Sequence, residues 1–269
     1  MNTSNEPVNH FDAYAPAEIA RMVEEVGVRK VRLSALQTTT LGFLAGAFIA
    51  FGGMFYTLVV ADSALGLGPT RLLGGVAFSL GLILVVIAGA ELFTGNNLIV
   101  MAWADRKIST GELLRNWVLV YAANLAGALG SVVLVYLSGT LDLGGGAVAR
   151  AAAGITEAKL QLDWQQAFAR GILCNALVCL AVWLSMAAHS VSGKILAIVF
   201  PITAFVALGF EHSVANMYLI PIGMLAGGEI DPAAFLANLV PVTLGNIVGG
   251  AGLVALVYWV AYVRSAEPQ

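Results

Sequence analysis

The stretch GAELFTGN at residues 89–96 recurs as GFEHSVAN at residues 209–216, and the two copies share the pattern G-x-E-x-x-x-x-N. Each copy lies inside an apolar segment, 72–101 or 195–228, that is longer than the roughly 20 residues that one membrane span needs. A charge at the centre of a bilayer costs about 3 kcal/mol on insertion scales. The glutamate of each copy therefore predicts a broken helix, with irregular backbone buried in protein at mid-depth.

The chain around these copies divides into two related halves. A second pair of stretches, NLAGALG at 124–130 and NIVGGAG at 246–252, repeats the pattern N-x-x-G-x-x-G. An odd number of spans in each repeat places the halves in opposite orientations, as in many transporters and channels. We therefore predict an all-α membrane protein with six transmembrane helices in an inverted 3+3 repeat, of which helices 2 and 5 are broken. The apolar segments are 38–60, 72–101, 116–138, 167–189, 195–228 and 232–263, and the repeats cover about 36–140 and 165–264.

The composition supports a membrane protein. Of the 269 residues 59% are apolar and only 11% are charged, whereas soluble domains carry about 25% charged residues. This excludes a soluble enzyme, a nucleic-acid-binding protein and a disordered chain. The net charge of −3 is too small to indicate any charged macromolecular partner. Membrane lipid is the surrounding medium that the sequence implies.

Basic residues predict the orientation, because Lys and Arg gather on the cytoplasmic side of membrane proteins. We expect both termini to be cytoplasmic. The N-terminal segment 1–35 carries an amphipathic helix, the channel domain covers 36–264, and 265–269 form a cytoplasmic tail. The side of the termini holds Arg21, Arg29, Lys30, Arg32, Arg106, Lys107, Arg115, Lys194 and Arg264, and the other side holds Arg71, Arg150, Lys159 and Arg170.

The residues that could carry chemistry lie at the two breaks. His212 is the only histidine at membrane depth, and it could donate a proton or a hydrogen bond or pair with Glu211. Thr94 lies in the equivalent break, and its hydroxyl could contact an anion or His212. Glu91 and Glu211 would bind a conducted cation. If an anion passes instead, they must be held by backbone N–H groups at half-helix N-termini, and we favour this structural role.

These residues resemble the formate/nitrite transporter family. The resemblance rests on AELFTG at 90–95, on GFEHSVANM at 209–217, and on NLVPVTLGN at 238–246, and it is greatest for the formate-channel branch. It implies a pentamer of six-helix protomers with an aquaporin-like fold, each with its own pore, in the bacterial inner membrane. It also implies two apolar constrictions around His212. The implied pore residues are Leu82, Leu92, Phe93 and Thr94 at the cytoplasmic constriction, Phe78 and Phe205 at the outer one, Asn175 and Asn246 on the cytoplasmic side, and Lys159 at the outer mouth.

The expected function is passage of formate or a similar small monovalent anion, with nitrite or hydrosulfide as the alternative. Aquaporins need Asn-Pro-Ala at both breaks, which this chain lacks, and an ammonia or cation channel would have to use the two glutamates. No catalytic constellation, metal motif or cofactor motif is visible, so we expect no enzyme. His212 could release a neutral acid across the apolar rings, or an anion could pass beside a cationic His212. The sequence leaves both routes open.

Overall fold

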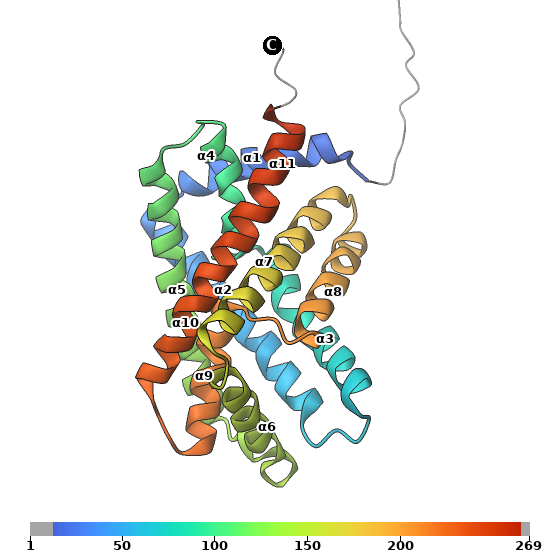
Figure 1. Cartoon of the computed structure of the whole chain (residues 1–269), viewed down its shortest axis with the longest axis vertical. Coiled ribbons are helices and arrows are strands. Elements are labelled where there is room, and N and C mark those ends of the chain that lie inside the picture. The colour runs from blue at the N-terminus through green and yellow to red at the C-terminus, as the bar shows by residue number, and fades with distance from the viewer. Residues whose placement is uncertain (1–12, 265–269) are drawn as a thin grey trace, which may run out of the picture.

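The computed structural model describes residues 13–264, so the expectations for 1–12 and for the tail 265–269 lie outside the described residues. Helix α1 (Pro16–Val31) begins with a proline at its first position and runs across one end of the helical bundle (Figure 1). Its apolar face is buried there through Ile19 and Val23. We call this end the α1 end.

The first half of the bundle contains two long helices and one broken helix. The helix α2 (Ala35–Val60) and the helix α5 (Thr110–Leu137) are continuous and start with side-chain caps from Ser34 and Ser109. Between them the chain forms a helix that is interrupted after Gly89. Its parts are α3 (Leu67–Ile83), the π-helical η1 (Leu84–Gly89), the 3-10 helix η2 (Gly95–Ile99) and α4 (Val100–Ala104).

The second half repeats this plan. The helix α7 (Trp164–Ala187) is continuous, and the next helix is divided into α8 (Val191–Ala207) and α9 (Ser213–Gly227). The last span combines α10 (Pro232–Ile247), η4 (Val248–Leu256) and α11 (Val257–Tyr262). Before α7, the short η3 (Thr140–Asp142) leads into α6 (Leu143–Leu160), at the end of the bundle opposite α1 (Figure 1). We call this the α6 end.

Five helical stretches in residues 13–264 are long and apolar enough to cross a membrane. The halves α8 and α9 have only 17 and 15 residues, so neither is long enough alone. Together they supply the remaining span. The structure thus confirms the all-α multi-pass membrane fold, with the second and fifth spans broken.

Both breaks follow from the glycine of the repeated motif. Gly89 has φ +86° and Gly209 has φ +71°, a left-handed conformation that side chains of other residues disfavour. The helix cannot continue through such a residue. The first position of G-x-E-x-x-x-x-N therefore ends one half-helix, and the glutamate two positions later lies in the non-helical segment between the halves.

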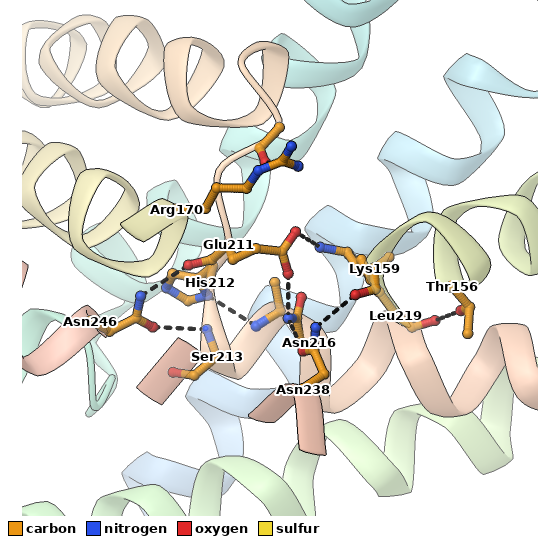
Figure 2. A network of polar contacts seen from close by, with 12 residues as sticks. Thr156, Lys159, Arg170, Glu211, His212, Ser213, Asn216, Leu219, Asn238 and Asn246 are labelled. Carbon is orange, nitrogen blue, oxygen red and sulfur yellow. Dashed lines mark hydrogen bonds and ion pairs between the residues drawn. The ribbon is translucent and has the colours of Figure 1, made fainter. Parts of the chain in front are cut away.

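The helix α6 was not expected from the sequence. Its residues are mostly Ala and Gly, so it lacks the apolar stripe that marks an amphipathic helix. Small residues instead permit close packing, and a side chain at Gly223 of α9 would collide with Thr156 of α6. Thr156 also donates a hydrogen bond from Oγ1 to the carbonyl of Leu219, 2.8 Å away, which holds α6 against α9 (Figure 2).

Candidate functional site

Two asparagines hold the backbone of the breaks. Asn246 Nδ2 donates to the carbonyls of Gly171 (2.8 Å) and Glu211 (2.9 Å), and its Oδ1 accepts from Ser213 N at 2.9 Å (Figure 2). In the other half, Asn124 makes the same three bonds, to Gly42 O at 2.7 Å, Glu91 O at 2.9 Å and Phe93 N at 2.9 Å. Each asparagine therefore satisfies backbone groups that the interrupted helix leaves unpaired.

The motif's glutamates are bound by a lysine and by the motif's own asparagine. Glu211 accepts from Lys159 Nζ at 2.9 Å through Oε1 and from Asn216 Nδ2 at 2.7 Å through Oε2 (Figure 2). Glu91 accepts from Lys30 Nζ at 2.7 Å and from Asn96 Nδ2 at 2.7 Å. The partners are therefore side chains, which corrects the expectation that backbone N–H groups hold these carboxylates. A charged donor compensates a buried carboxylate better than a peptide dipole does.

The role of Lys30 as the partner of Glu91 was not predicted from the sequence, although the spacing of the repeat indicates it. Lys30 and Lys159 are 129 residues apart, which is also the spacing between Gly42 and Gly171. These glycines accept the equivalent asparagine bonds described above. Residues 129 apart thus make the same contacts from α1 and α6, and the two helices are equivalent elements at opposite ends of the bundle (Figure 1).

His212 and Thr94 meet where the two breaks come together. Thr94 Oγ1 lies 2.9 Å from His212 Nε2, and both residues are buried. His212 Nδ1 accepts the backbone N–H of Ala215 at 2.9 Å, so that it caps the start of α9. A backbone N–H can only donate, which requires Nδ1 to be unprotonated. The imidazole is therefore neutral in this arrangement, with its proton on Nε2 facing the Thr94 hydroxyl.

Cavities approach these breaks from both ends. At the α1 end a cavity of about 470 Å³ is lined by Leu82, Leu92, Lys30 and Lys194, among others. At the α6 end a cavity of about 60 Å³ includes His212 in its wall. Its lining also contains Phe78, Phe205, Lys159, Gly209 and Glu211.

Two aromatic rings stand next to His212. Phe78 and Phe205 meet edge to face with 5.6 Å between their centroids, and both side chains are buried. Phe205 also stacks on His212, with 5.9 Å between the rings. The structure therefore brings together the central and outer residues that the sequence analysis selected, and it places Lys159 in an ion pair with Glu211.

Four of the selected residues line neither cavity, namely Thr94, Phe93, Asn175 and Asn246. Phe93 packs its ring edge-on against Trp117 and Tyr121 of α5, at centroid distances of 6.0 and 4.8 Å, and it lines neither cavity. Asn246 is fully buried behind its break. Asn175 is also fully buried, where its Nδ2 lies 3.2 Å from Thr94 O and 2.7 Å from Asn246 O. The side-chain amides of both asparagines are hydrogen-bonded to the backbone at the breaks. They therefore stabilise the site and do not line a pore.

Comparisons with known proteins agree with this arrangement. The sequence profile described as Formate/nitrite transporter matches residues 17–260. The chain is 41% identical over 279 residues to the formate channel FocA of Escherichia coli K12, covering 96% of this chain and 98% of FocA.

Solved structures show the same likeness. A structure described as a pentameric formate channel with formate bound superposes with a TM-score of 0.79 at 40% identity, covering 85% of this chain and 98% of that one. An aquaglyceroporin from Plasmodium falciparum shares the fold with a TM-score of 0.53 at 16% identity, covering 84% of this chain and 99% of that one. The chain belongs to the formate/nitrite transporter family.

Proposed function

We propose that this protein is a membrane channel for formate, assembled as a homopentamer in which every protomer has its own pathway. The observation that carries the proposal is the contact between Thr94 and His212, at the meeting point of the two breaks and beside the α6-end cavity. The named activity of FocA and of the pentameric formate channel, both about 40% identical to this chain, supports formate as the substrate.

The geometry favours an anion or its acid over a cation. Each carboxylate that could bind a cation already accepts a lysine and an asparagine, and both glutamates are buried. The polar hydrogen that the site offers is the Nε2–H of His212. A carboxylate oxygen can replace Thr94 Oγ1 as the acceptor of that hydrogen, whereas a metal cation or ammonium cannot.

The proposed pathway follows the two cavities. Formate enters from the α6 end and passes the rings of Phe78 and Phe205. It then accepts a hydrogen bond from His212 Nε2–H and leaves past Leu82 and Leu92 at the α1 end. An apolar ring gives a bare anion no stabilisation. The hydrogen bond from His212 lowers that barrier. Because His212 Nδ1 accepts the N–H of Ala215, this geometry favours a neutral donor over a cationic histidine. Thr94 holds the donor in place when the site is empty of substrate.

The excess of basic residues near α1 supports an orientation in which the α1 end faces the cytoplasm of a bacterial inner membrane and the α6 end faces outward. Under this orientation Lys159 belongs to the outer side and Lys30 to the cytoplasmic side. The same assignment makes α1 a cytoplasmic helix that covers the inner cavity.

Flux through purified protein in liposomes tests the proposal. Formate is expected to pass fastest among formate, nitrite, hydrosulfide and acetate. His212→Ala is expected to assemble normally while its formate flux falls, because the Nε2–H donor is lost. A higher flux for nitrite or hydrosulfide would show that this anion, and not formate, is the preferred substrate. Equal formate flux through the native protein and His212→Ala would contradict the role given to the histidine.

A further inference from the structure

Two arginines converge on the break at the α6 end. Arg71 of α3 donates from Nη1 to the carbonyl of Ala207 at 3.1 Å, and Arg170 of α7 donates from Nη1 to the carbonyl of Gly209 at 3.3 Å. A side chain at Gly209 would begin 3.2 Å from Arg71 Nη1 and 3.9 Å from Arg170 Nη1. Both guanidinium groups therefore meet over this one residue, and Figure 2 shows Arg170 beside the segment that leads into Glu211.

Their position places two charges at the rim of the outer cavity. Gly209 is part of the wall of the 60 Å³ cavity that also contains His212. Arg71 is exposed and Arg170 is half-buried, so solvent reaches both groups. A guanidinium carries five N–H donors, and the bonds to Ala207 and Gly209 each use only one nitrogen.

The charge balance separates these arginines from Lys159. Lys159 Nζ lies 2.9 Å from Glu211 Oε1, so this pair adds no net charge to the cavity. Within residues 13–264, neither Arg71 nor Arg170 has a carboxylate within 4.0 Å, whereas Arg150 on the same side is paired with Asp62 at 2.9 Å. The net positive charge of the outer rim therefore comes from the two arginines.

We propose that Arg71 and Arg170 form the outer capture site for the small monovalent carboxylate that the channel conducts. The proposal rests on the proposed function and deepens it. The two guanidinium groups raise the local concentration of the anion at Gly209, and their planar N–H groups hold its carboxylate until it moves toward His212. Arginine stays protonated at every physiological pH, so capture is independent of pH over that range.

A charge-removal experiment tests the capture site. The double variant Arg71→Gln with Arg170→Gln is compared with the native protein, with Arg71→Lys plus Arg170→Lys, and with Arg150→Gln as a matched control from the same side. The measurement is the initial influx of subsaturating formate applied at the α6 end, at low and high concentrations of an impermeant salt. Removing the two positive charges from the rim of the cavity is expected to lower formate influx about five-fold at low salt. The deficit should shrink at high salt, because salt ions screen the charges.

The controls distinguish capture from a purely structural role. The lysine pair is expected to retain most of the influx, and Arg150→Gln to behave like the native protein. A deficit of equal size at both salt concentrations, or a lysine pair as impaired as the glutamine pair, would show that the arginines only cap the carbonyls of the break and would overturn the proposal.

The salt dependence of the native protein and its total formate flux decide the remaining outcomes. If the glutamine pair does not assemble, the native protein alone is sufficient, because influx from the α6 end that does not fall with added salt would overturn the capture site. A native protein that passes no formate under any condition contradicts the proposed function. Formate flux that is normal in the native protein and unchanged in the glutamine pair contradicts only the capture site.

Discussion

At the scale of single residues, the site depends on how one imidazole is held. His212 accepts a backbone N–H at Nδ1 and faces a hydroxyl at Nε2, so its ring orientation and its proton are both determined by neighbours. The two phenylalanines next to it add no polar group. A small acid that reaches this point finds the Nε2–H of His212 beside two apolar rings.

Replacing the hydroxyl of Thr94 tests this arrangement. Thr94→Val keeps the side chain's shape but leaves the Nε2–H of His212 without its partner, at a cost of about 1 kcal/mol or more. We expect formate flux to fall about five-fold because the ring is no longer held in its donating orientation. Thr94→Ser retains the hydroxyl and serves as the control. Equal flux in the valine and serine variants would contradict the role of the hydroxyl.

The aromatic pair at the α6 end gives a second prediction at this scale. Truncating Phe78 and Phe205 together to alanine widens the cavity beside His212 and is expected to make acetate pass faster than it does through the native protein. Phe55→Ala is the matched control, since Phe55 is 46% exposed on the outside of the bundle. The measurement is acetate uptake into liposomes by assembled protein. If acetate uptake by the double variant equals that of the control, the rings are packing residues.

At the scale of helices, α1 and α6 are fastened to the breaks by the same chemistry. Lys30 bridges α1 to Glu91 and Asn96, with distances of 2.7 and 2.8 Å. Lys159 bridges α6 to Glu211 at 2.9 Å. A helix that crosses the end of the bundle is thereby tied to the centre of a transmembrane span.

Removing the lysine of α1 should loosen that helix. Lys30→Ala leaves Glu91 buried without its cation, and we expect a loss of about 2 kcal/mol, less than for a fully buried pair because Lys30 is one quarter exposed. The neighbouring Arg29→Ala removes only an exposed pair with Glu25 and should cost less than about 0.5 kcal/mol. Hydrogen exchange in α1 measures both effects. Equal exchange in the two variants would show that Lys30 does not fasten the helix.

The docking of α1 should also respond to pH. Burial, together with the neighbouring Asp105, raises the pKa of Glu24 above its ordinary value of 4.5, although Lys107 Nζ lies 2.7 Å away. The docked helix therefore binds a proton more readily than the undocked one. Its extra stability is present at low pH and is lost as the pH rises through the raised pKa. The lowered pKa of Asp105 acts only below its ordinary value of 3.8, and the raised pKa of Lys107 acts only above 10.5.

Hydrogen exchange of α1 checks this sign. After correction for intrinsic rates, exchange should slow as the pH is lowered from about 7 to about 5. Glu24→Gln is expected to abolish the change, whereas Glu25→Gln, whose side chain is exposed, should leave it intact. Exchange that accelerates on acidification would show that the charged form of Glu24 holds the helix.

Sequence patterns predicted the broken helices at the core of the bundle. They did not predict the helix α6 or the contact of Lys30 with Glu91. The helix breaks were predictable because a Gly-x-Glu stretch within an apolar segment favours an interruption that keeps the acid out of lipid, and Thr94 and His212 share these breaks. The orientation of Phe93 was not predictable, since an irregular backbone has no period that assigns a side chain to one face. The helix α6 was hidden by its small residues, and the partnership of Lys30 required knowledge of which element crosses the end of the bundle.

At the scale of the whole molecule, the outer surface is apolar and the charges lie near the ends. Leu67, Leu137 and Phe200 are each more than 70% exposed, as expected for side chains that contact lipid or a neighbouring copy. Inside, the carboxylates at the two breaks are paired with lysines from opposite ends. The centre of the protein therefore offers an anion the Nε2–H of His212, while both glutamates are already paired with lysines and closed to a cation.

The most direct test compares formate and potassium in the same liposomes. The native protein is expected to release a formate gradient rapidly while it retains a potassium gradient under conditions where the membrane potential is clamped to zero. His212→Ala, measured alongside, should slow formate release and leave potassium retention intact. Potassium that crosses as readily as formate would contradict anion selectivity, because Glu91 and Glu211 would then be open to the pathway instead of being occupied by their lysines.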